Sequence, residues 1–385
     1  MTKILYMDHQ GTTPTENRVI SAMSMYWNEN FGNPHASQHI KGWQAQSLID
    51  RALSNISSFI GAEREEIIFT SGATESNNIA IFSLCSLKER YAARTKILLS
   101  PIEHKCVLNS VAFWAPKFDL DVSYLMLTPE GLIDLNYLSE IVSEDVLFCS
   151  IGSVNNEIGS IQNLSEISTL LRRWGIFLHS DCAQAPKTID CSSSAQWVDM
   201  ASFSGHKIGG PPGVGCLFIH AEMQATFTAL IQGGGQQLGM RGGTLPLPLC
   251  VGLGEAFSIL NEPDAAQNLE ITKALRDYLY KKLQELSCSV FLNGPPFKHR
   301  HIGNLNIFFE GYNAADLLLS AQPKLCASTG SACGSGTIEP SHVLLSLGLD
   351  QNRADGSLRF SLSHSNTRAE IDEAVELISS KLSSL

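Results

Sequence analysis

Short runs of apolar residues recur along the first half of the chain, and most are followed by a polar turn and a helical pattern. The clearest runs lie at residues 67–70, 96–100, 146–150, 176–181 and 200–204. Runs of this length are typical of strands that are buried on both faces, as in a parallel sheet. A further run at residues 213–219 is expected to return beside them. The alternation of strands and helices therefore predicts an α/β fold with a largely parallel sheet.

The pattern changes at residues 261–264, where Asn-Glu-Pro-Asp interrupts the helical periodicity. Beyond this break, helices and strands alternate again. The last helix is expected to begin at a capping box formed by Thr367 and Glu370, followed by apolar residues at helical spacing. We predict a large domain over residues 15–260. Residues 1–14 and 261–385 are expected to form a smaller α/β domain, which includes an N-terminal strand.

Composition excludes several classes of partner. The 385 residues, 44% hydrophobic and 17% charged, are enough for two globular domains. No apolar run approaches the roughly 18 to 20 residues that span a membrane, and the N-terminal apolar stretch is too short for a signal peptide. A net charge of −11 without any basic run argues against direct contact with nucleic acid. Neither a membrane nor a nucleic acid is therefore expected as a direct partner.

The ten cysteines show no C-x-x-C pair and no framework spacing. Four lie in apolar surroundings and are expected to be buried free thiols, namely Cys85, Cys149, Cys216 and Cys250. This usage fits a reducing cytoplasm. We predict no metal site.

Lys207 is a candidate cofactor-binding lysine. It follows an apolar run and the turn Ser204-Gly205-His206, and Gly-Gly-Pro-Pro-Gly follows it. Schiff-base chemistry requires a lysine held in place with a lowered pKa, so that its amine is free to attack. Ser204 and His206 would be available there to bind a phosphate. The alternative is a surface lysine in a glycine- and proline-rich turn.

Three further signals lie at the ends of predicted strands. Residues 71–78 open a helix, whose N-terminus around Ala73 and Thr74 suits a phosphate, although a simple capped helix is the alternative. Asp181 is placed to pair with a protonated pyridine nitrogen, and Gln184 to donate to a ring oxygen, unless Asp181 is only a helix cap. His104 would stack on the ring and shuttle protons, or is a structural histidine. Their common position at strand ends favours one site for pyridoxal phosphate (PLP).

With these residues in place, the sequence resembles the NifS/IscS family of cysteine desulfurases, which are PLP enzymes of the type I aminotransferase fold. The resemblance covers nearly the whole chain. The matching segments include residues 6–8, 69–78, 103–105, 154–159, 202–207, 233–236, 239–241 with 243–244, 330–333 and 358–361.

The resemblance implies a role for each candidate residue. Lys207 carries the cofactor as a Schiff base, His104 stacks on the ring, and Asp181 with Gln184 tunes it. The phosphate and substrate contacts implied in the same way are Ala73, Thr74, Ser204 and His206 for the phosphate, and Asn156 and Arg359 for the substrate cysteine. Thr244 would reach the phosphate of the partner subunit, which implies a homodimer with shared active sites.

Cys333 is the expected nucleophile. It lies in a glycine-containing segment, about residues 326–338, that resembles the longer catalytic loop of the family's first group. The implied reaction converts L-cysteine to L-alanine and leaves a persulfide on Cys333 for a sulfur-acceptor protein. Acceptors in this family serve iron–sulfur cluster assembly, tRNA thiolation or DNA phosphorothioation. The sequence ends just after the last predicted helix, where housekeeping members carry a scaffold-docking tail, which favours a dedicated pathway.

Two other functions remain open from the residues alone. One is another PLP reaction on the same fold, such as selenocysteine lysis or transamination, although Cys333 argues against a plain aminotransferase. The other is a non-catalytic platform for sulfur-transfer partners. Several positions depart from the family pattern, including Gln237, Leu238, Gly242 and His364. Cys326 is either a second relay thiol or a buried strand residue.

Overall fold

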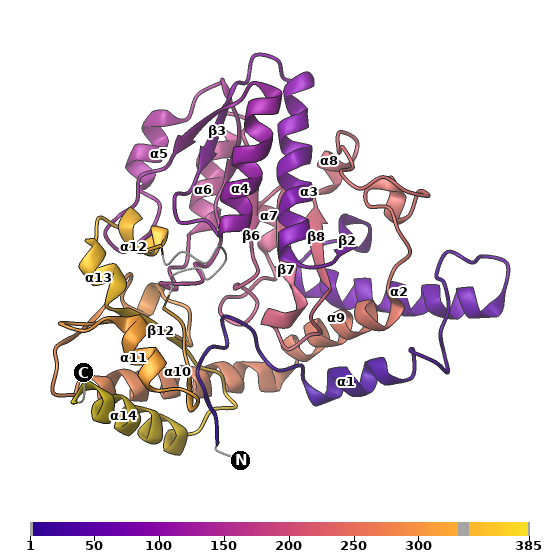
Figure 1. Ribbon diagram of the computed structural model, residues 1–385. Helices are drawn as coiled ribbons and strands as arrows, with labels where there is room; N and C mark the ends of the chain where they lie inside the picture. The colour runs from indigo at the N-terminus through magenta and orange to yellow at the C-terminus, as the bar shows by residue number, and fades with distance from the viewer. Residues whose placement is uncertain (1–2, 330–338, 384–385) are drawn as a thin grey trace.

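The computed structural model describes residues 3–329 and 339–383. Cys333 and residues 330–338 around it lie outside this range. A seven-stranded sheet forms the centre of the molecule (Figure 1). Its strands, in spatial order, are β2 (Ile67–Thr70), β8 (Gly215–Ile219), β7 (Met200–Ser204), β6 (Phe177–Asp181), β5 (Val146–Ser150), β3 (Lys96–Leu99) and β4 (Asp121–Tyr124).

The sheet is mostly parallel, as the apolar runs predict. Only β8 is antiparallel to both of its neighbours, β2 and β7. Every residue of β5, β7 and β8 is buried, and consecutive residues of β2 such as Ile68 and Phe69 face opposite hydrophobic clusters. Burial on both faces explains why these strands are continuous apolar runs rather than alternating ones.

Helices cover both faces of the sheet. The first cluster receives α1 (Asn17–Ser24), α2 (Ile40–Ile60), α6 (Leu164–Arg172) and α9 (Leu247–Leu260). The second receives α3 (Ala73–Ser86) and α4 (Lys105–Trp114). Gly254 of α9 lies directly against Ala52 of α2, where an added Cβ would be 2.5 Å from the Ala52 Cα. The shorter helices of this part are α5 (Leu135–Ile141), α7 (Ser194–Trp197) and α8 (Ala221–Gln224).

A third hydrophobic cluster lies beyond residue 261, where α10 (Pro263–Leu283) begins. Its antiparallel sheet has the order β12 (Ser357–Ser361), β10 (Asn304–Phe309) and β9 (Val290–Leu292). The last helix, α14 (Arg368–Leu382), starts at the predicted Thr367–Glu370 capping box. The remaining elements are β11 (Leu325–Cys326), α11 (Ala314–Ser320), α12 (His342–Ser346) and α13 (Gln351–Asp355).

The N-terminal segment joins this third cluster. Strand β1 (Leu5–Tyr6) pairs in parallel with β11, and Asp8 bridges to Ser361 at the end of β12. Leu5 and Met7 are fully buried there. Both chain ends lie on this side of the molecule in Figure 1. No helix within the described ranges is long and apolar enough to cross a membrane.

Candidate active site

A cavity of about 560 Å³ lies where the parallel strands of the central sheet end. Residues following β2, β3, β5, β6 and β7 line it, and Gln10, Gly11 and Arg359 close it from the side of the third cluster. In open α/β sheets, ligands bind outside the carboxyl ends of the strands. The structure brings the following predicted residues to this cavity: Ala73, Thr74, His104, Asn156, Asp181, Gln184, Ser204, His206, Lys207 and Arg359.

Lys207 lies one turn beyond β7, in a short 3₁₀ helix. Its Nζ donates to the carbonyl oxygens of Gln10 and Gly11, at 2.5 Å each. Burial and the nearby Arg359 together lower the pKa of Lys207 to about 8, against the opposing effects of Asp8 and Asp181. A reactive, partly neutral amine is therefore held near physiological pH, as Schiff-base chemistry requires.

The N-terminus of α3 forms an anion-binding cradle. Gly72, the residue before the helix, has φ +147° and no side chain to cap the first N–H groups. The Ser204 hydroxyl lies 3.7 Å from where a Gly72 Cβ would be. Gly215 allows this close approach, since its own Cβ would be 2.7 Å from the Gly72 Cα. With unused N–H donors and the helix dipole directed at the cavity, the cradle suits a phosphate.

Asp181 is held at the end of β6 by two hydrogen bonds. Asn77 Nδ2 donates to Oδ2 at 2.7 Å, and the Ala183 N–H donates to Oδ1 at 2.9 Å. Gln184 Nε2 donates to the Gln10 carbonyl at 3.0 Å. A fixed carboxylate and a fixed amide on neighbouring positions can address two atoms of one planar ring.

His104 precedes α4 and is a neutral imidazole. Burial lowers its pKa, and Lys207 lowers it further against the opposing effect of Asp181. The Cys106 N–H donates to His104 Nδ1 at 3.1 Å, so the neutral ring carries its proton on Nε2. The Cys106 sulfur also lies 3.0 Å from Nδ1. Nε2 is thus left to exchange a proton within the cavity.

Arg359, on β12, is the cation available for a substrate carboxylate. Its Nη1 donates to the Asn156 carbonyl at 2.8 Å and its Nη2 to Asp8 Oδ1 at 2.6 Å. Its Nε is buried and has no hydrogen-bond partner among the described residues. A guanidinium carries five N–H donors, so donors remain for a bound carboxylate.

Thr244 is the one described site residue that the structure does not bring to this cavity. It is exposed and follows a segment anchored to the start of α3. The anchor is Arg241, which makes a bidentate contact with Glu75 at 2.7 and 3.2 Å.

The sequence did not point to Gln10, Glu103 or Cys106 as residues that line this cavity. Glu103 is buried beside Gly152, and burial together with the nearby Asp181 raises its pKa to about 8. Cys106 had a local signal, its position two residues after His104. Gln10 had no such local signal, because it is brought to Lys207 by the pairing of β1 with β11 and of Asp8 with Ser361.

A profile of the class-V aminotransferase family matches residues 5–374. The chain belongs to the class-V aminotransferase family. It is 42% identical over 383 residues to a protein of Rickettsia bellii named cysteine desulfurase IscS. The alignment covers 99% of this chain and 92% of that relative. A solved structure described as a NifS-like protein covers 100% of both chains with 30% identity and a TM-score of 0.91. Another, SspA in complex with cysteine, covers 94% of this chain and 99% of its own, at 33% identity and a TM-score of 0.80.

These similarities confirm the predicted fold, enzyme class and cofactor: the protein is a PLP-dependent cysteine desulfurase. The site of this class-V aminotransferase fits PLP, because an uncapped helix N-terminus, a fixed carboxylate and a lysine with a lowered pKa surround one cavity. When bound, the cofactor supplies an electron sink for the substrate's Cα. Among the residues that line this cavity, Lys207 Nζ and His104 Nε2 are able to hold or move a proton, and Arg359 is able to bind a carboxylate.

Loading of the cofactor should follow the ionisation of Lys207. In this family member the amine is mostly protonated below about pH 8 and mostly neutral above it. The rate at which the apoprotein binds added PLP, followed by absorbance, is expected to rise with pH to a midpoint near 8. An ordinary lysine would place that midpoint near about 10.4. Because Arg359 lowers this pKa, Arg359→Gln should move the midpoint to a higher pH. A midpoint near about 10 in both the wild type and the variant would contradict a lowered pKa for Lys207.

Proposed function

We propose that Cys333 takes the sulfur atom of L-cysteine as a persulfide while the cavity residues hold and activate the substrate. Both flanks of residues 330–338 meet the cavity wall, and this observation carries the proposal. On one side, Ser328 and Arg359 exchange backbone hydrogen bonds of 3.0 and 2.6 Å. On the other, His342 Nε2 contacts the Glu103 carbonyl at 3.0 Å and Ser341 donates to Glu157.

Chain length limits where Cys333 can be. Cys333 is five positions after Ser328 in the sequence, and five residues of fully extended chain span at most about 18 Å. Ser328 itself is paired with Arg359, a lining residue of the cavity. This short separation in sequence supports Cys333 as the nucleophile toward a substrate held by Arg359.

The other cysteines are poor candidates for the nucleophile. All nine in the described part of the chain are free, and burial raises the pKa of every one. Cys106 lines the cavity, yet its pKa is raised to about 12 by burial and by Asp181. Cys326 lies in β11 as expected for a strand residue, although it is half-buried rather than buried. Since the thiolate is the nucleophile, a raised pKa disfavours these thiols as the attacking group near neutral pH.

The remaining roles follow from position. Lys207 would hold the cofactor and move the Cα proton, while His104 would stack on the ring and exchange a proton at Nε2. Asp181 would pair with the protonated pyridine nitrogen, and Gln184 would donate a hydrogen bond to a ring oxygen. Arg359 and Asn156 would orient the substrate carboxylate. The cradle of Ala73, Thr74, Ser204 and His206 would bind the phosphate.

Peptide mapping after a single turnover tests the proposal. The holoenzyme is mixed with one equivalent of L-cysteine, alkylated and digested, and the added sulfur is located by mass spectrometry. We expect one sulfur atom on the peptide that contains Cys333 and one L-alanine released. The other nine cysteines are internal controls, and a persulfide on Cys106 or Cys326 instead would refute the assignment.

We further propose that the enzyme is a homodimer in which Thr244 completes the partner's phosphate site. Large apolar side chains gather around α2 and the segment before Thr244: Trp27, Phe31, Ile40, Trp43 and Leu238 are each more than half exposed. His35 and Leu238 line one groove, so the two surfaces adjoin. Exposed apolar patches of this kind mark association surfaces.

Breaking this surface should give monomers. Trp43→Glu is expected to shift the sedimentation mass from dimer to monomer and to weaken PLP retention, since Thr244 would no longer reach its partner. Phe113→Glu, at an exposed aromatic residue on α4, is the matched control and should stay dimeric. A wild-type monomer that retains PLP would contradict the shared site.

The sulfur acceptor is proposed to be a separate protein in a reducing compartment, where the nine free cysteines would persist. Relatives named IscS and a structure titled DndA are both similar to this chain, the latter at 37% identity with a TM-score of 0.77. Transfer of labelled sulfur from the loaded enzyme to candidate acceptors identifies the pathway.

A further inference from the structure

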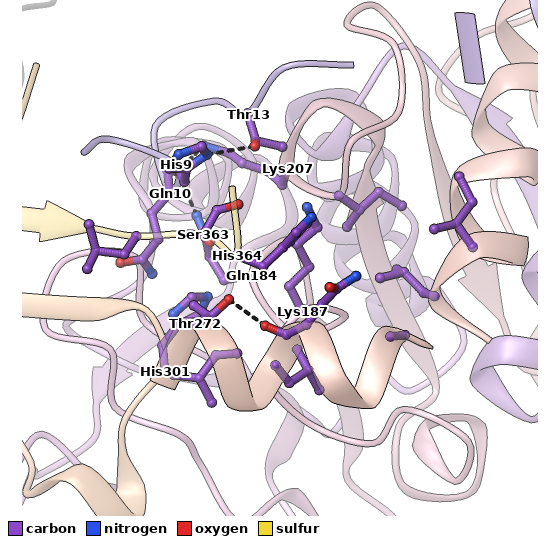
Figure 2. Close-up of a pocket in the computed structure, with 18 of the residues that line it drawn as sticks. His9, Gln10, Thr13, Gln184, Lys187, Lys207, Thr272, His301, Ser363 and His364 are labelled. Carbon is purple, nitrogen blue, oxygen red and sulfur yellow. Dashed lines mark hydrogen bonds between the residues drawn. The ribbon is translucent and has the colours of Figure 1, made fainter. Parts of the chain in front are cut away.

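A second cavity, of about 120 Å³, adjoins the active site. It shares Gln10, Ala183, Gln184 and Lys207 with the larger cavity. Its other walls come from the N-terminal segment, the turn after β6, the first turns of α10 and the residues that follow β12. Figure 2 shows the polar residues around this space, above the helical turn that carries Thr272. The cavity is several times larger than the space that one water molecule needs.

Two opposite charges line this cavity without pairing. Among residues 3–329 and 339–383, neither the Lys187 ammonium nor the Glu16 carboxylate makes a hydrogen bond or an ion pair, although each lines the wall. Burial lowers the pKa of Lys187, and Glu16 opposes this effect, so the two groups interact across the space without contact. A ligand that carries only a negative charge would pair with Lys187 but not with Glu16, and a ligand that carries only a positive charge would pair with Glu16 but not with Lys187. A ligand that carries both charges would pair with both.

Neutral donors complete the polar wall. Gln10 is 2% exposed, and its Nε2 is a buried donor without a partner in the described structure. His9 and His364 have pKa values lowered by burial and by the nearby Lys187, and burial with surrounding cations lowers that of His301 to about 3. These imidazoles are therefore neutral and add hydrogen-bonding capacity without net charge.

Much of the remaining wall is apolar, although Thr13, Asn268, Thr272 and Ser363 also line it. The apolar part is formed by Ile208, Ile259, Leu260, Leu269, Ile302 and Leu362. Such a surface favours a short uncharged side chain on the ligand.

We propose that this cavity binds a small neutral amino acid as its zwitterion. The carboxylate pairs with Lys187 and the Gln10 amide, the ammonium pairs with Glu16, and the side chain contacts the apolar wall. The reaction itself consumes L-cysteine and releases L-alanine, and both belong to this class. Because Lys207 and Gln184 also line the active site, occupancy of the second cavity touches the catalytic residues directly.

Equilibrium dialysis of radiolabelled L-alanine against the PLP-loaded enzyme tests the site. We expect two alanine molecules per subunit at saturation, of which only one alters the absorbance of the cofactor. Lys187→Met and Glu16→Gln should each weaken the spectrally silent event at least tenfold, as expected for loss of a charge-assisted contact. Lys298→Met and Glu144→Gln, at exposed positions, are the matched controls. L-Cysteine, tested on Cys333→Ala, then distinguishes substrate from product as the preferred ligand.

A cavity-filling variant and two singly charged competitors test the proposal further. Ala265→Leu fills the cavity from α10 without changing its charges and should also remove the silent event, which keeps the test decisive if Lys187→Met fails to fold. Propionate and ethylamine each lack one charge and should compete at least tenfold more weakly than alanine. A single alanine per subunit, a silent event unchanged in the cavity variants, or equal competition by propionate would overturn the proposal.

Discussion

Lys207→Ala is expected to lower the rate of L-alanine formation from L-cysteine by about 10⁴-fold or more. In the proposed mechanism, the substitution removes both the covalent attachment of the cofactor and the base at the substrate's Cα, and general-base catalysis alone is typically worth about 10² to 10⁴-fold. The side chain is half-buried, its amine is held by the Gln10 and Gly11 carbonyls, and no other lysine in the described part of the chain lines this cavity. The variant should also lose PLP on dialysis, measured by absorbance.

Two controls make this result specific to the amine. Lys298→Ala, at an exposed lysine, should keep full activity and its cofactor. Added ethylamine should restore part of the Lys207→Ala rate, because a small amine can occupy the space that the side chain leaves. A variant that keeps more than about a tenth of the wild-type rate would refute the assignment.

The parts of the fold that the sequence predicts best are the strands of the central sheet. Residues 146–150 and 200–204 are apolar because both of their faces are buried, so local pattern and final environment agree. The last helix is equally predictable, since its capping box is a local hydrogen-bond pattern. Local signals of this kind also mark the strand ends, which is why most cofactor residues could be proposed before their geometry was known.

Contacts that depend on distant pairing could not be predicted. Gln10 lies beside Lys207 because β1 pairs with β11 and Asp8 bridges to Ser361, contacts that span more than 300 residues of sequence. The departure from the family pattern at Gln237 is another case. Its side chain makes both hydrogen bonds to the Phe69 backbone, at 2.6 and 3.0 Å, and so extends the edge of β2. Gly242 likewise permits a close approach to Gly233, where an added Cβ would be 2.6 Å from the Gly233 Cα.

The second large effect is expected for Cys333→Ala, which should reduce sulfide release from L-cysteine with a reductant by about 10³-fold or more. A nucleophilic thiol has no substitute in this reaction, since the buried cysteines in the described part of the chain have raised pKa values. The variant should nevertheless stay yellow and give the same substrate-induced change in cofactor absorbance as the wild type. Binding and proton transfer would then be intact while sulfur transfer is lost.

Cys326→Ala and Cys106→Ala are the matched controls, one on the strand that leads toward Cys333 and one within the cavity. Each should retain sulfide release within about threefold of wild type if Cys333 alone attacks the substrate sulfur. A relay through Cys326 would instead leave persulfide on Cys333 in the Cys326→Ala protein while slowing delivery to an acceptor. The two thiols are therefore distinguished by where sulfur accumulates, and wild-type sulfide release by Cys333→Ala would exclude it as the nucleophile.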